Sequence, residues 1–280
     1  MINPLKRTTL KGFLWYQGET NSMFNREFYD CTFPAMIDAW RKEFSDNSNT
    51  GPSAPFGFVQ LSTMTYGATE MNMARTRWHQ TADYGVVPNP KQVNVFMAVA
   101  IDTYDDYWNS IHPRYKQIVG ERLSIPAMNL IYCDKSFPMM GPQPKQAILL
   151  SQQKVVIEYD QGFSYRQSEN ISGFYYCCLH FDSCDSDFIW GEIEPEYVQQ
   201  DQLSNTISID LQFAEQCKIG VPHLAYLWRQ TPIKGYLAAP MYGNDKFRLP
   251  SAPWKLNSDS FIKSSFIKFY DHSELDKACE

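Results

Sequence analysis

Apolar residues in the first half of the chain alternate between continuous runs and a three-and-four-residue spacing. Continuous runs occupy residues 11–15, 55–61 and 93–101, and each predicts a strand buried on both faces. Between the first two runs, the apolar positions 24, 28, 29, 33, 36, 37, 40 and 44 have helical spacing. The sequence therefore predicts a helix over residues 24–44, which Pro34 is expected to kink or restart.

Two further helices complete the strand–helix alternation. One is expected over residues 70–82. The other is expected to begin at Pro113, because proline suits the first helical position, and to run to residue 123 or on to residue 132. Buried strands that alternate with helices predict a parallel sheet with helices on both faces, which is a three-layer α/β architecture.

The pattern changes near residue 133. Short β-type runs follow, separated by glycine and proline, at residues 147–150, 154–159, 173–179, 206–211 and 224–228. This punctuation is typical of a β-sandwich. We therefore expect an α/β domain over residues 1–132 and a β-rich, sandwich-like domain over residues 133–280.

Charge and hydropathy exclude several classes of protein. The chain has 25 Lys and Arg residues against 31 Asp and Glu residues, a net charge of −6, and no basic cluster, which disfavours nucleic-acid binding. No apolar run approaches the ~20 residues that a membrane-spanning helix needs. The first ten residues lack the apolar stretch of a signal peptide, so the chain made alone is expected to be cytoplasmic.

Cysteine usage favours disulfides or buried thiols over a metal site. The chain has seven cysteines, an odd number, without a C-x-x-C pair. Cys177, Cys178, His180 and Cys184 resemble a metal cluster, but neighbouring strand residues point to opposite faces, whereas zinc sites use separated pairs on tight turns. We expect no metal. The aromatic content of 15% suits a sugar-stacking cleft and a β-rich core equally, and the core interpretation is the default.

Two polar loops follow predicted parallel strands, at residues 17–21 and 102–112. Ligands of open α/β sheets bind at such carboxyl ends. In the second loop three acids precede His112. A histidine that acts as a general base needs a partner that orients its imidazole, and a carboxylate in the same loop can supply it. These acids are Asp102, Asp105 and Asp106. On spacing alone, a His112 that only caps the following helix is as well supported as a general base.

The first loop belongs to the segment WYQGETN, residues 15–21. The amide of Gln17 could donate a hydrogen bond to a developing oxyanion, and Gly18 lets the backbone approach a substrate closely. Glu19 could orient a supporting network. Taken alone, the same residues would favour a simple polar turn after a strand.

Six segments together resemble one family in the correct order over nearly the whole chain. They are WYQGETN (15–21), RWHQTADYGVVPNPK (77–91), FMAVAID (96–102), IHPRYKQ (111–117), YLW (226–228) and LPSAPW (249–254). The segments resemble the sialate O-acetylesterases, which are carbohydrate esterases of the SGNH-hydrolase superfamily. The resemblance implies hydrolysis of O-acetyl esters of sialic acids by a Ser–His–acid mechanism without a cofactor.

The resemblance also implies roles for individual residues. His112 is the expected base, Gln17 stabilises the oxyanion, and Asp105 or Asp102 is the expected acid. Substrate contacts are expected from Trp15, Glu19, Asn21 and His79. The implied ligand is O-acetylated sialic acid or a sialoglycan. The complete family enzyme is expected to be a lysosomal or secreted glycoprotein, and Asn170 begins an acceptor triplet.

Two departures from the family pattern qualify this expectation. The family's nucleophilic serine lies on a Gly-x-Ser turn, and neither Gly-Asp-Ser nor Gly-Gln-Ser occurs here. We therefore expect a carboxyl-terminal portion that lacks the opening strands, with the amino-terminal half as a partner. The position three residues before His112, usually Asp in the superfamily, is Asn109. An acid elsewhere in the loop or the carbonyl of Ser110 could orient the imidazole instead.

Three functions stay open. The chain could be an incomplete sialate O-acetylesterase without its nucleophile. It could be a catalytically inactive carbohydrate-binding or regulatory fragment of the same fold. Finally, an esterase of this fold could act on another acetylated sugar.

Overall fold

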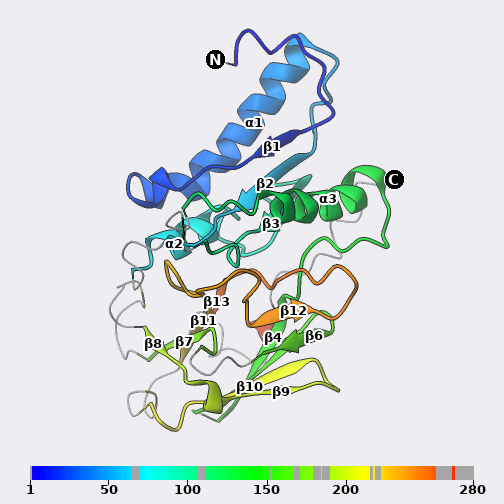
Figure 1. The fold of residues 1–280 in the computed structure, drawn as a ribbon. Coiled ribbons are helices and arrows are strands. Elements are labelled where there is room, and N and C mark those ends of the chain that lie inside the picture. The colour runs from blue at the N-terminus through cyan, green and yellow to red at the C-terminus, as the bar shows by residue number, and fades with distance from the viewer. Residues whose placement is uncertain are drawn as a thin grey trace.

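The computed structural model of the 280-residue chain has a parallel α/β part above a group of antiparallel sheets (Figure 1). It describes residues 2–64, 70–105, 107, 111–151, 153–166, 171–178, 184, 190–214, 217, 222–256 and 267–268. Several positions singled out in the sequence lie outside these residues. They are Asp106, Asn109, Ser110, Asn170 and His180.

The three strands predicted in the first part form one parallel sheet in the order β1-β2-β3. Their bounds are Phe13–Trp15, Phe56–Gln60 and Val95–Val99, slightly shorter than the apolar runs. Every residue of β2 and β3 is buried, as continuous apolar runs predict. The same expectation is wrong for β1, where Leu14 is 67% exposed, because β1 lies at the edge of the described sheet. Within the described residues β1 pairs only with β2, so no described strand occupies its other edge.

Helices cover both faces of this sheet. Helix α1, Tyr29–Asn47, places Phe33 edge-on against Phe56 and Phe58 of β2. Val59 points to the opposite face, where it packs with Val119 of α3, Lys116–Tyr132. Side chains alternate along a strand, so neighbouring residues of β2 contact different helices. The third helix, α2, spans Asn72–His79.

The predicted helix ends needed correction. Helix α3 begins at Lys116 and not at Pro113, because Asp105 accepts hydrogen bonds from both the backbone and the side chain of Arg114 and holds this segment in the loop. Helix α2 ends earlier than residue 82, since Ala82 and Asp83 have positive φ. Residues 26–28 form a separate 3-10 turn, η2, and α1 runs through Pro34 without a restart.

The predicted change to β structure after residue 133 is confirmed. One antiparallel sheet has the order β14-β4-β5-β10-β9, a second has β13-β11-β7-β8, and β12 pairs with β6. The strands are β4 (Pro144–Ser151), β5 (Lys154–Tyr159), β6 (Phe163–Tyr165), β7 (Phe174–Cys177), β8 (Gly191–Glu192), β9 (Val198–Asp201), β10 (Thr206–Asp210), β11 (His223–Tyr226), β12 (Met241–Gly243), β13 (Trp254–Leu256) and β14 (Ile267–Lys268). No helix among the described residues is long and apolar enough to span a bilayer.

Two disulfides explain the neighbouring cysteines. Cys177 bonds to Cys184, and Cys178 bonds to Cys217. Adjacent residues at a strand end point in opposite directions, so each sulfur meets a different partner. The disulfide alternative is thus confirmed for these four cysteines. In the described part of the chain no three His, Cys, Asp or Glu side chains converge as a metal site would require.

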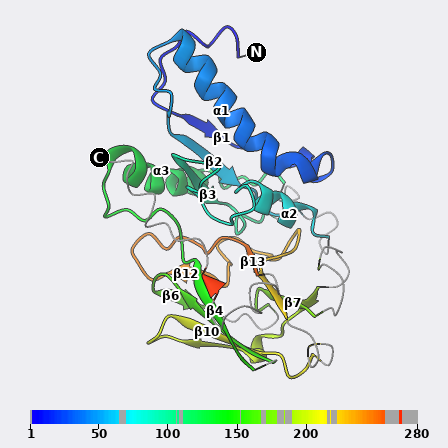
Figure 2. The same cartoon turned by 180° about the vertical axis from the view of Figure 1, so that it is seen from behind.

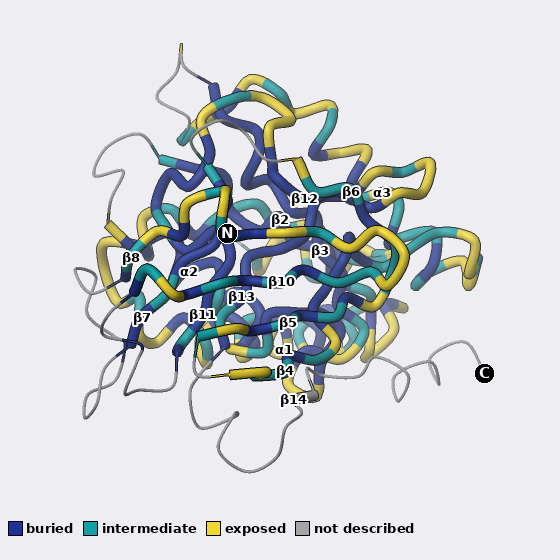
Figure 3. The backbone as a smooth tube through the Cα atoms, turned by 90° about the horizontal axis from the view of Figure 1, so that it is seen from below, coloured by how far each residue is buried: buried dark blue, intermediate teal, exposed yellow. Residues whose placement is uncertain are grey.

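The two parts of the chain share one core. A single cluster of buried side chains includes Phe56 and Ile101 from the α/β part together with Phe174 and Tyr226 from the antiparallel sheets. Buried stretches run continuously through the middle of the molecule, with exposed stretches at its periphery (Figure 3). Seen from behind, β12 lies below α3, at the junction of the two parts (Figure 2).

Candidate functional site

The Gln17 loop directly follows β1, at the carboxyl end of the parallel sheet. Gln17 Nε2 donates to Asn21 Oδ1 at 2.8 Å, and the Tyr29 hydroxyl lies 3.4 Å from Gln17 Oε1. Burial raises the pKa of Tyr29 to about 12, so this hydroxyl stays protonated at neutral pH and donates. The amide of Gln17 is therefore held at both ends, and among the described residues only one of its two N–H bonds has an acceptor.

Gly18 is required where it stands in this loop. Its φ is +139°, and a Cβ at this position would lie 3.2 Å from Leu61 Cδ1 and 3.3 Å from the Tyr29 hydroxyl. A side chain would therefore be strained and would also displace the residue that holds Gln17. The close approach at Gly18 is thus made by Leu61 and Tyr29, and an approach of the backbone to a substrate stays a prediction.

The other candidate residues of this loop have different surroundings. Trp15 packs edge-on against Trp40 of α1, with 5.5 Å between ring centroids. Lys116, the first residue of α3, lies 4.4 Å above the ring of Tyr16, and burial lowers the Lys116 pKa while Glu19 opposes this shift. The loop after β1 thus contacts the start of the helix that follows the His112 loop.

His112 is exposed and lies in the loop between β3 and α3. Tyr115 occupies the N-cap of α3 and no side chain caps the helix, so the interpretation of His112 as a helix cap is wrong. Within the described residues His112 makes no side-chain hydrogen bond or ion pair. The chain places this imidazole where a substrate could reach it.

Asp105, one of the two expected acids, is engaged by Arg114. The Nε and Nη2 atoms of Arg114 donate to its two carboxylate oxygens at 2.8 and 2.9 Å, and the Arg114 backbone N–H donates at 2.9 Å. The hydrogen bond from Arg114 lowers the Asp105 pKa to about 2 despite burial. Among the described residues, no hydrogen bond or ion pair joins this carboxylate to His112.

This pair predicts a measurable pH dependence. A depressed carboxyl pKa stabilises the fold above the ordinary value of 3.8, and this contribution is lost as pH falls from there through about 2. NMR titration of the Asp105 carboxyl should give a midpoint near 2 in the native chain and closer to the ordinary value in Arg114→Met. A native midpoint near 4 would contradict the pairing.

Asp102, the other expected acid, is fully buried at the junction of the two parts. Its carboxylate accepts from Arg122 Nη1 at 2.5 Å, from Arg122 Nη2 at 2.8 Å, and from the Tyr242 hydroxyl at 2.5 Å. Its backbone carbonyl accepts from Leu237 N–H at 2.8 Å. Asp102 therefore joins β3, α3 and β12, and it does not contact His112.

His79, an expected substrate contact, lies on α2 among charged residues. Its Nδ1 atom is 2.6 Å from Asp83 Oδ1, and its Nε2 atom is 3.8 Å from Glu27 Oε2. Both partners are exposed carboxylates outside the His112 loop. The structure thus groups His79 with η2 and not with the residues around His112.

Sequence reasoning missed two buried arginines. Arg122 lies on the buried face of α3, together with Val119, Pro126 and Asn129. An arginine at the three-and-four spacing of a buried helix face was the signal that could have indicated a buried ion pair. Arg77 is fully buried, and its hydrogen bonds within the described residues all go to carbonyls, at 2.7 to 3.1 Å. Burial lowers its pKa to about 9. No sequence pattern predicted this role.

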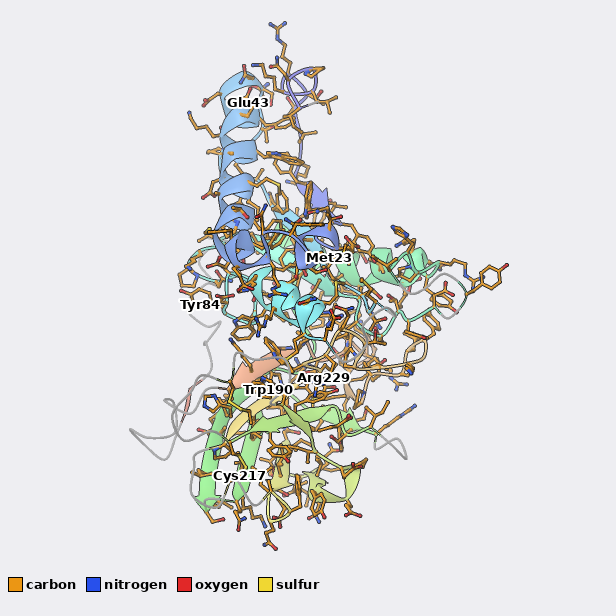
Figure 4. The ribbon with its side chains drawn as sticks, turned by 90° about the vertical axis from the view of Figure 1, so that its left-hand side faces the viewer. Met23, Glu43, Tyr84, Trp190, Cys217 and Arg229 are labelled. Atoms are coloured by element: carbon orange, nitrogen blue, oxygen red, sulfur yellow. A yellow bond between two sulfur atoms is a disulfide. The ribbon has the colours of Figure 1, made fainter. Side chains whose placement is uncertain are left out.

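Arg77 connects the loop after β2 to the antiparallel sheets. Its acceptors are the carbonyl oxygens of Leu61, Ser62, Arg229 and Gln230. Arg229 lies beside Trp190 below α2 (Figure 4), and its guanidinium donates to the Trp190 carbonyl at 2.5 Å. This network fixes one more loop at the carboxyl edge of the parallel sheet.

Comparison with known proteins identifies the family. Residues 145–258 match the family model described as the sialate O-acetylesterase C-terminal domain. The sialate O-acetylesterase of Homo sapiens is 38% identical over 260 residues, covering 91% of this chain and 47% of that protein. The enzyme of Rattus norvegicus is 44% identical over 184 residues, covering 64% of this chain and 34% of that protein. The chain thus spans half the length of these relatives or less.

A solved structure shares the fold. A carbohydrate acetylesterase from Xanthomonas citri superposes with a TM-score of 0.69 at 24% sequence identity, over 92% of this chain and 53% of that one. The order of the matched segments, the family model and the curated relatives lead to one conclusion. The chain belongs to the sialate O-acetylesterase family and covers its carboxyl-terminal portion.

Proposed function

We propose that this chain supplies the base and the oxyanion donor of a sialate O-acetylesterase, whose nucleophilic serine is not provided by these 280 residues. The observation that carries the proposal is the arrangement of two residues at the carboxyl edge of the parallel sheet. There, a held Gln17 amide and an exposed His112 follow β1 and β3 of the same sheet. The names of the curated relatives supply the ester and the sugar.

The proposed mechanism uses the groups described above. A serine hydroxyl attacks the acetyl carbonyl and passes its proton to His112, which later returns a proton to the leaving sugar oxygen. The free N–H of Gln17 stabilises the oxyanion that forms. Because arginines engage Asp102 and Asp105, orientation of the imidazole falls to Asp106 or to the carbonyl of Ser110. No cofactor takes part in this scheme.

The same proposal extends to organisation and setting. Residues 1–132 form the carboxyl-terminal part of an SGNH-type esterase domain, and residues 133–280 form a β-rich domain. The amino-terminal half of the esterase is the proposed partner, and O-acetylated sialic acid or a sialoglycan is the proposed ligand. A lysosomal or secreted glycoprotein is the proposed form of the complete enzyme.

The experiment measures acetate release in two preparations. The 280-residue chain alone should release no acetate from p-nitrophenyl acetate or O-acetylated sialic acid, because a base without its nucleophile cannot form the acyl-enzyme. Burst kinetics or covalent labelling of this chain by a fluorophosphonate would contradict that expectation. Addition of the serine-bearing half of a family enzyme should yield activity toward O-acetylated sialic acid that exceeds activity toward acetylated xylose. The reverse preference would reject the proposed substrate.

A non-catalytic role is the second candidate. The observation that favours it is the engagement of both described carboxylates of the His112 loop by arginines, which leaves neither for catalysis. A carbohydrate-binding or regulatory fragment would bind sialosides but would stay inactive after the serine-bearing half is added. The same pair of preparations therefore separates the two functions.

A further inference from the structure

A hollow lies at the His112 loop, at the junction with the antiparallel part. It has a volume of about 360 Å³, at the lower end of the range for small-molecule sites. Its side chains are four tyrosines and one ion pair. They come from Tyr104, Tyr107, Tyr115, Tyr236, Asp105 and Arg114.

Both parts of the chain build this hollow. Tyr236, which follows the antiparallel strand β11, stacks on Tyr115 with 3.9 Å between ring centroids. The backbone of Tyr236 pairs with Thr103, and Leu237 N–H donates to the carbonyl of Asp102. The segment that carries Tyr236 is therefore fixed to the loop that carries His112.

The exposed faces of the hollow are aromatic and polar. Tyr236 is 42% exposed although Tyr115 covers one side of its ring, and Tyr107 is 74% exposed. The Arg114 guanidinium lies 5.0 Å from the centroid of the Tyr107 ring. Arg114 uses Nε and Nη2 for Asp105, and within the described residues its Nη1 makes no hydrogen bond. The hollow thus combines two exposed tyrosine rings with a fixed donor.

We propose that this hollow is a subsite for the glycan of a sialylated substrate, in which a pyranose ring lies on Tyr236 and Tyr107 while Arg114 Nη1 donates to the acidic sugar. Aromatic faces pack against the apolar C–H face of a sugar ring, and a guanidinium is a preferred donor to a carboxylate. Because the ion pair with Asp105 already orients Arg114, little side-chain freedom is lost on binding. The inference rests on the proposed function, which supplies the class of ligand.

The test is a binding measurement that needs no chemistry. Titration calorimetry of the 280-residue chain with 3′-sialyllactose should give a dissociation constant below about 10 mM, and lactose should bind more weakly. Tyr236→Ala and Tyr107→Ala should each weaken binding by roughly 2–12-fold, the effect expected of one lost aromatic contact. Tyr132→Ala is the matched control, because Tyr132 is an exposed tyrosine at the end of α3 that does not line the hollow.

Each outcome decides the proposal. Weaker binding in both variants, with Tyr132→Ala unchanged, would support it. No binding by the native chain, equal binding of lactose, or unchanged binding in both variants would overturn it. Because binding is measured without acetate release, the two proposals can fail separately. No acetate release after the serine-bearing half is added, beside intact sialyllactose binding, would reject the proposed function and leave the subsite standing.

Discussion

In an active enzyme that carries the nucleophilic serine, His112→Ala should lower kcat/KM by ~10²–10⁴-fold or more, the range for loss of a general base. The imidazole is the proton acceptor in the proposed mechanism, and no other histidine lies in this loop. Its exposure means that removal should leave the unfolding midpoint unchanged. Steady-state kinetics with O-acetylated sialic acid, together with thermal unfolding, measure the two effects separately.

Matched variants of the same loop sharpen this prediction. Asp105→Asn should cost less than His112→Ala, because the structure engages Asp105 with Arg114 and not with the base. Asp106→Asn tests the remaining acid of the loop. An Asp105→Asn enzyme as inactive as His112→Ala, with normal folding, would identify Asp105 as the acid of the triad and would contradict the present assignment.

Arg122→Met should lower the free energy of unfolding by about 3–5 kcal/mol, the cost of leaving one buried charge without its partner. Asp102 is fully buried and Arg122 is 4% exposed. The bidentate pair between them is joined by the Tyr242 hydroxyl, so its loss also loosens the junction with β12. Urea unfolding of the native chain and the variant measures this difference.

Two comparisons test the cause of that loss. The double variant Asp102→Leu/Arg122→Met removes both charges and should recover part of the stability, since an apolar replacement of a buried pair is often tolerated. Lys42→Met breaks the exposed pair with Asp46 and should leave the unfolding midpoint unchanged. A double variant less stable than Arg122→Met would show that the pair is not the source of the effect.

The structural role of Asp102 affects how kinetic data on variants of this loop are interpreted. An acid that follows a strand and precedes a histidine has the sequence signature of a catalytic partner. Its carboxylate is instead held by a helix twenty residues later and by a tyrosine 140 residues later. A loss of activity in Asp102→Asn must therefore be separated from a loss of folded protein before it is assigned to chemistry.

The sequence by itself determined the features that depend on local periodicity and short motifs. Continuous apolar runs predicted the places of β1, β2 and β3, because strands buried on both faces need apolar residues at every position. Burial on both faces is confirmed for β2 and β3 and is wrong for β1, where Leu14 is exposed. The change near residue 133 predicted the β-rich part, and the adjacent cysteines favoured disulfides or buried thiols over a metal site. Six segments in the correct order, among them WYQGETN and IHPRYKQ, together indicated the family.

Only the tertiary structure decided which charged groups meet. Arg122 holds Asp102 and Arg114 holds Asp105. Nothing in the spacing of the two acids distinguishes an arginine partner from an imidazole. Tyr236 reaches the loop after β3 from the antiparallel part, a contact between residues more than a hundred positions apart. Burial, ion pairing and stacking depend on distances across the folded chain, and sequence periodicity carries no information about those distances.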